Sequence, residues 1–189
     1  RRQRQMCIRD SNSRYTDVYL KDMSYVLKDA SFNSKPMTAD RVAYIKKVAE
    51  SITAGASNDA AKLAKIYSYV ATNFYYDHYA YDLYIKTGGK YNIQCVNPYD
   101  NLYNQRNKIA STNSTSDGKV ATVCDGYAAM IVALCRSLGI PARSVYGCKN
   151  DTSDGRTSQV NTARKNHWWA EVHICLLYTS PSPRDGLLS

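Results

Sequence analysis

The sequence predicts an α+β domain, and three observations carry that prediction. Apolar residues recur every three or four positions over 41–53 and 59–74, which is typical of amphipathic helices. A third apolar helix begins at or just before Cys124 and is stopped by a glycine and a proline. Two alternating segments, 142–147 and 168–174, then indicate strands. Helices followed by strands favour an antiparallel sheet packed on the third helix.

The segment between the second and third helices, residues 78–119, shows little periodicity. It is rich in tyrosine, asparagine, glycine and serine, and we expect turns or short strands there at best. A connection this long often carries function.

Both ends of the chain resemble a sequencing adapter more than folding sequence. The strings RRQRQMCIRDS and CLLYTSPSPRD have no helix or strand period, and their reverse translations resemble the two arms of a transposase-type library adapter. A basic N-terminal arm that binds nucleic acid or a membrane is the alternative for the first string. We expect 1–11 and 175–189 to be non-native, 12–39 to be poorly defined, and 40–174 to be one domain that is truncated at its C-terminus.

Charge and hydropathy limit the kinds of partner that the sequence predicts for this protein. The formal charge of +9 includes four arginines and one aspartate in residues 1–11, which leaves +6 for the rest. The remaining lysines and arginines are interspersed with acidic residues, so we expect no nucleic-acid partner. No apolar run approaches the roughly 18 residues of a membrane span, so none is predicted in this chain.

The cysteines give no metal-ligand pattern. Two of the six lie in the adapter-like ends, and the other four are Cys95, Cys124, Cys135 and Cys148. No CxxC pair and no cysteine–histidine pair at zinc spacing occurs, so we predict no metal and no cofactor. Cys95 and Cys148 could form a disulfide in a secreted protein or could be two unrelated thiols, and the sequence leaves both open.

Cys124 and His167 are the candidate catalytic residues. A cysteine in the first turn of a helix lies near unpaired N–H groups and the positive end of the helix dipole, which favour a thiolate. His167 precedes the second strand, where its imidazole could face that helix end. A cysteine on a helix and a histidine on a strand are the two halves of the pair used for acyl transfer. Burial of Cys124 as a small apolar residue is the alternative.

Three motifs in order resemble the transglutaminase-like superfamily. They are DAAKLAKIYSYVATNFYYD, GKVATVCDGYAAMIVALCRSLGIPARSVYG and NHWWAEVHI. The resemblance implies a papain/transglutaminase-like core, with Cys124 as nucleophile and His167 as general base. Tyr127, Arg143 and Gly147 match positions that shape the helix, strand and turn around them.

The resemblance also implies a function. We expect a cysteine protease or amidase that cleaves peptide or side-chain amides through a thioester, or less favourably a cross-linking transglutaminase. The implied partner is a protein or peptide substrate, and the implied location is extracellular or in a bacterial cell envelope. Two alternatives stay open: a non-catalytic peptide- or wall-binding module, and a stapled domain in which Cys124 is bridged.

The third member of the family's triad is missing from the match. An aspartate normally follows on the next strand, but the chain reaches its adapter-like end first, so the sheet is expected to be incomplete. Glu171 lies four residues from His167 along a strand, about 13 Å away, which makes it a poor partner for the imidazole. We assign no third residue and expect slow turnover, since losing such an aspartate costs on the order of 10⁴ in rate.

Overall fold

The computed structural model describes residues 37–91, 93, 97–109, 120–147 and 167–174. The predictions for 1–36 and 175–189 and for a Cys95–Cys148 pair lie outside these residues. The described elements are α4 (Ala39–Thr53), α5 (Asp59–Asn73), β1 (Phe74–Tyr76), α6 (His78–Lys86), α7 (Pro98–Arg106), β2 (Val120–Thr122), α8 (Cys124–Ser137), β3 (Ala142–Gly147) and β4 (His167–Val172). The mixture of helices and small sheets confirms the α+β class.

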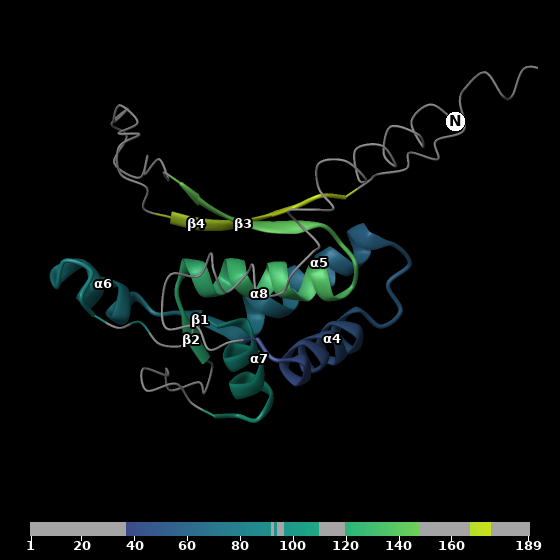
Figure 1. Cartoon of the computed structure of the whole chain (residues 1–189), viewed down its shortest axis with the longest axis horizontal. Helices are drawn as coiled ribbons and strands as arrows, with labels where there is room; N and C mark the ends of the chain where they lie inside the picture. Colours follow the sequence, from purple (N-terminus) through teal and green to yellow (C-terminus); the bar gives the residue numbers. More distant parts are fainter. Residues whose placement is uncertain (1–36, 92, 94–96, 110–119, 148–166, 175–189) are drawn as a thin grey trace, which may run out of the picture.

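Helix α8 is the centre of the domain. The β3–β4 pair lies along one side of it, and α4 and α7 lie on the opposite side (Figure 1). Its side chains are therefore buried almost all round rather than on one stripe, and Met130, Leu134 and Cys135 are fully inaccessible to solvent. Cys135 is thus a core residue, as predicted. Gly139 ends the helix with a φ of 76°, in the left-handed region that suits glycine.

The two predicted strands are present and antiparallel. Their register runs from Ala142 opposite Val172 to Gly147 opposite His167. Ala170 and Val172 turn toward the core, as the alternating pattern predicts. The buried side chain of Arg136 on α8 donates from Nε to the carbonyl oxygen of Ala142 at 2.7 Å. This bond fixes the start of β3 against the last turn of α8.

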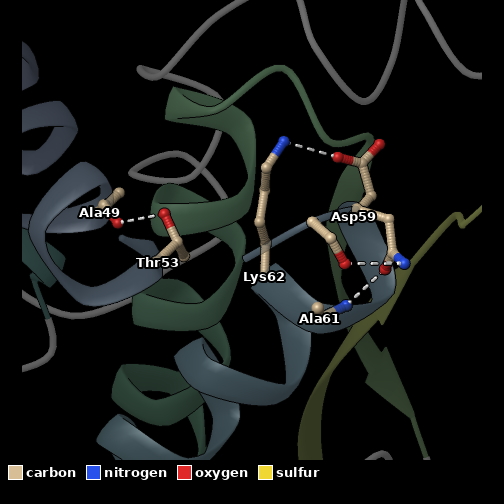
Figure 2. Close-up of polar contacts among 7 residues, drawn as sticks. Ala49, Thr53, Asp59, Ala61 and Lys62 are labelled. Atoms are coloured by element: carbon tan, nitrogen blue, oxygen red, sulfur yellow. Dashed lines mark hydrogen bonds and ion pairs between the residues drawn. The ribbon is translucent and has the colours of Figure 1, made fainter. Parts of the chain in front are cut away.

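The first two described helices agree closely with the predicted ranges, and the N-cap of α4 is Thr38. Asn58 caps α5, because its Oδ1 accepts from the backbone N–H of Ala61 at 2.9 Å. Figure 2 shows this cap beside the 2.9 Å ion pair of Lys62 with Asp59. At the end of α4 the hydroxyl of Thr53 donates to the carbonyl oxygen of Ala49 at 2.8 Å (Figure 2).

The expectation for residues 78–119 was wrong, because α6 and α7 are helices within it. Each begins at a strong capping residue: Asp77 accepts from the N–H of Ala80 at 2.8 Å, and Asn97 precedes Pro98 in the first turn of α7. Both helices have only nine residues, and they are too short to show a clear apolar period. In the sequence, these two helices are indicated by their N-cap residues and not by an apolar period.

A second, parallel pair of strands was also not predicted. β1 follows α5 directly, and β2 precedes α8, with Tyr76 opposite Thr122 in the register. The backbone N–H of Asp77 continues the ladder by donating to the carbonyl oxygen of Thr122 at 2.9 Å. This pair ties the end of α5 to the chain that enters α8. Among the helices that the structure describes, none is long and apolar enough to cross a bilayer.

Candidate active site

Cys124 is the first residue of α8, and its sulfur faces donors. The preceding N-cap residue, Val123, has no side chain that could accept from the first-turn N–H groups. The backbone N–H of Asp125 makes a hydrogen bond with the sulfur of Cys124. The thiol is free and half-buried, which contradicts the reading in which Cys124 is bridged.

His167 is the first residue of β4 and enters the site together with its neighbour. The backbone N–H of Trp168 also bonds to the sulfur of Cys124, so the start of β4 lies at the N-terminus of α8. Gly147 lies opposite His167 in the ladder, and a Cβ there would lie 2.4 Å from the ring of Trp169. Gly147 therefore leaves room for the indole, whose ring stacks on the imidazole at a centroid separation of 6.5 Å.

Cys124 and His167 line the same cavity, which has a volume of about 1030 Å³. Its walls come from one face of α5, the end of β1, the first two turns of α8, and β4 with the residues that follow it. The other described lining residues are Ala60, Leu63, Ala64, Tyr67, Tyr76, Tyr127, Ala128, Ile131, Trp168, Trp169, Ala170, Val172 and Ile174. None of these carries a carboxylate, an ammonium or a guanidinium group. The structure thus brings the two predicted residues together at the polar end of an apolar cavity.

Tyr76 belongs to the site, although the sequence did not indicate it. Its hydroxyl makes a side-chain hydrogen bond with Cys124. The sequence shows Tyr76 only as part of an aromatic cluster at the end of a helix. Its place beside Cys124 depends on the pairing of β1 with β2. Each of these strands has only three residues, so neither shows an alternating pattern from which the pairing could be predicted.

Burial raises the pKa of the Cys124 thiol, and the neighbouring carboxylate of Asp125 raises that pKa further. Three hydrogen bonds to the sulfur lower this pKa, from the backbone N–H groups of Trp168 and Asp125 and from the Tyr76 hydroxyl. Their effect is smaller than that of desolvation, so the pKa is raised on balance. The resting group is therefore the neutral thiol at neutral pH. This differs from the thiolate that the helix start alone favours, because burial outweighs the helix end.

Asp125 follows Cys124 in the first turn of α8 and is buried, as are Asn101 and Thr122, whose side chains lie against the neighbouring Gly126. Oδ1 of Asp125 accepts from the N–H of Gly126 at 2.8 Å. In the described part of the chain, its Oδ2 and both amide atoms of Asn101 find no hydrogen-bond partner. Burial raises the pKa of Asp125 from 3.8 to about 6. A carboxylate at this position is costly at neutral pH.

Asp125→Asn is therefore expected to change how stability depends on pH. Folded Asp125 binds a proton more tightly than the unfolded chain, so its contribution to stability is full below pH 4 and is lost as the pH rises to 6. Relative to wild type, the variant should gain about 2–3 kcal/mol between pH 4 and pH 7 in urea unfolding. The asparagine keeps an oxygen for Gly126.

The control for this prediction is Asp82→Asn, which removes one exposed carboxylate from α6. This variant shows how much of the change comes from removing any one carboxylate. A level difference for Asp125→Asn would show that Asp125 is not held at a raised pKa. Because the carboxylate also raises the pKa of Cys124, alkylation of that thiol at pH 7 should be faster in Asp125→Asn.

The carboxylate of Glu171 contacts Arg143 and Trp169. Its Oε2 lies 2.6 Å from Nη2 and 2.7 Å from Nε of Arg143, the residue opposite it in the β3–β4 ladder. Its Oε1 accepts from the indole N–H of Trp169 at 3.4 Å. The carboxylate fastens the two strands together, which agrees with leaving it out of the catalytic set. The ion pair is about 40% exposed, so it contributes at most about 1 kcal/mol.

The described residues contain no group of three histidine, cysteine, aspartate or glutamate side chains that could hold a metal ion. The chemistry available in the cavity is that of a thiol, an imidazole, a phenol and backbone N–H groups. This set can form and break a thioester.

Fold and site together define the class: an α+β domain in which a cysteine on a helix and a histidine on a strand meet in one cavity. A sequence profile of the transglutaminase-like superfamily matches residues 46–182. The chain belongs to this superfamily, whose members generally catalyse acyl transfer through a thiol. A search of curated proteins and a search of solved structures gave no match.

Proposed function

We propose that this protein is a thiol acyl-transfer enzyme, with Cys124 as nucleophile and His167 as general base. The observation that carries the proposal is that both residues line one cavity, with the sulfur at the uncapped start of α8. The substrate is a peptide bond or a side-chain amide of a protein or peptide. Water is the acceptor, so the enzyme is a protease or amidase.

The proposed reaction begins with the neutral thiol. His167 removes its proton while the sulfur attacks the amide carbonyl carbon, and the C=O electron pair moves to oxygen. The backbone N–H of Cys124, in the first turn where helical N–H groups have no intrahelical acceptor, donates to that oxyanion. The tetrahedral adduct then expels the amine, which takes the proton from His167 and leaves a thioester. Water attacks the thioester, releases the acid and restores the thiol.

Hydrolysis is preferred to cross-linking because of the cavity walls. A lysine acceptor brings an ammonium group, and the described lining residues have no carboxylate to bind it. Their apolar surface suits a neutral acyl donor.

Acylation of Cys124 by an activated ester tests the proposal. The protein is incubated with a p-nitrophenyl ester, and the modified peptide is located by mass spectrometry before and after hydroxylamine. One acyl group on Cys124 that hydroxylamine removes is the expected result, with none in Cys124→Ala.

Failure to acylate Cys124 would contradict the proposed enzyme. The non-catalytic binding module would then be favoured if iodoacetamide also reacted no faster with Cys124 than with Cys135 and was insensitive to His167→Ala. An acyl group that persists in Cys124→Ala would place the reactive residue elsewhere.

A further inference from the structure

We propose that Tyr76 is a further catalytic residue, whose hydroxyl holds the sulfur of Cys124 and then donates to the substrate oxyanion. The proposal rests on the proposed acyl transfer at Cys124 for its second part only. The contact between the hydroxyl and the sulfur stands on the structure.

The pairing of β1 with β2 is what places Tyr76. The two strands are parallel, and Tyr76 lies opposite Thr122, the last residue of β2. Cys124 follows Thr122 by two residues and begins α8. The N–H of Asp77 bonds to the carbonyl oxygen of Thr122, so the ladder extends one residue beyond Tyr76. The backbone thus holds the tyrosine beside the residues that lead into Cys124.

The ring of Tyr76 is held from several sides. It stacks on Tyr127, one turn into α8, with centroids 6.3 Å apart and planes 17° apart. His78 lies at a centroid distance of 4.8 Å, and Tyr81 of α6 meets the ring edge-on at 6.3 Å. The ring is half-buried and forms part of the cavity wall. A phenol fixed in this way can donate without first being ordered.

The chemistry of the hydroxyl suits a donor. Burial raises the pKa of Tyr76, and the nearby Cys124 raises it further, so the phenol keeps its proton at neutral pH. Its bond to the sulfur favours the ionised thiol and opposes the effects of burial and of Asp125. The other titratable groups that line the cavity in the described part of the chain are His167 of β4, Tyr67 of α5 and Tyr127 of α8. Tyr81 of α6 acts electrostatically on Tyr76.

The same hydroxyl can reach the oxyanion. In the tetrahedral adduct the new oxyanion is only two covalent bonds from the sulfur. A donor that already contacts the sulfur therefore needs only a small rotation to bond to that oxygen. The backbone N–H of Cys124 supplies one donor of this site, and Tyr76 supplies the second from another strand.

Alkylation of the thiol tests the contact without requiring any turnover. The rate of iodoacetamide reaction at Cys124 is measured against pH by peptide mass spectrometry in wild type and in Tyr76→Phe. The variant is expected to react about tenfold more slowly at pH 7, because a hydrogen bond to the charged sulfur is lost. The two rates should converge at high pH, where the thiol is ionised in both.

Tyr75→Phe is the matched control, since it removes a hydroxyl from the same strand at a residue that is not among the cavity lining. Its profile should follow wild type. Identical profiles for Tyr76→Phe and wild type would overturn the proposal. If Tyr76→Phe unfolds at a lower temperature, 3-fluorotyrosine at position 76 keeps the ring and gives a stronger donor. That substitution should speed alkylation at pH 7, and an unchanged or slower rate would count against the proposal.

Acylation by the activated ester then tests the oxyanion role. In Tyr76→Phe the rate constant for acylation at saturating ester should fall by about 10²- to 10³-fold, with little change in the ester concentration at half-saturation. Equal acylation rates would remove Tyr76 from the oxyanion site while leaving Cys124 as nucleophile. If wild type forms no acyl-enzyme, the proposed function and the oxyanion role both fail, and the alkylation profile still decides the contact with the sulfur.

Discussion

His167→Ala is expected to slow acylation of Cys124 by an activated ester about 10²- to 10⁴-fold at pH 7. The physical reason is the raised pKa of the thiol, which leaves little thiolate at neutral pH unless a base removes the proton during attack. Single-turnover release of p-nitrophenol measures the rate. In the variant the rate should rise steadily with pH up to the range in which the thiol itself ionises.

Exogenous imidazole and a second histidine variant sharpen this prediction. Imidazole should partly restore acylation in His167→Ala, because the cavity has room for it beside the sulfur. His173→Ala is the control: it removes an imidazole that is not among the residues lining the cavity, and it should react at the wild-type rate. A rate for His167→Ala within about threefold of wild type would exclude general-base catalysis by this residue.

Gly126→Ala is expected to be strongly destabilising. A Cβ at Gly126 would lie 1.9 Å from Oγ1 of Thr122 and 3.2 Å from Nδ2 of Asn101, and both side chains are fully buried. Overpacking of this kind costs about 1–3 kcal/mol or more, and it exceeds the roughly 1 kcal/mol that alanine gains over glycine in a helix. We expect a net loss of about 2 kcal/mol in urea unfolding. Acylation should slow as well, because Thr122 adjoins the residues that enter α8.

Removing the obstructing side chain is the control for this clash. Thr122→Ala deletes Oγ1, so the double variant Thr122→Ala/Gly126→Ala should be destabilised by less than the sum of the two single variants, by at least about 1 kcal/mol. Additive free energies would show that Thr122 does not limit the space at Gly126. Wild-type stability for Gly126→Ala would mean that the helix and β2 can separate at no cost.

The site was only partly predictable. Cys124 at a helix start and His167 at a strand start follow from local patterns, and the structure places both on one cavity. Their catalytic roles stay a prediction, as does an extracellular or envelope location. Tyr76 could not be predicted, because three-residue strands have no period and their partner lies far along the chain. No pattern in the sequence indicates that Asp125 is buried, yet it is 2% exposed.

The sequence by itself determined the helices α4, α5 and α8, the antiparallel strands β3 and β4, and the superfamily, because apolar periods, caps and short motifs act over a few residues. Only the tertiary structure decided the surroundings of the sulfur. Whether Cys124 rests as thiol or thiolate depends on burial and on donors from β1 and β4. Desolvation and hydrogen bonds between distant segments exist only once the chain has folded, so no local pattern contains them.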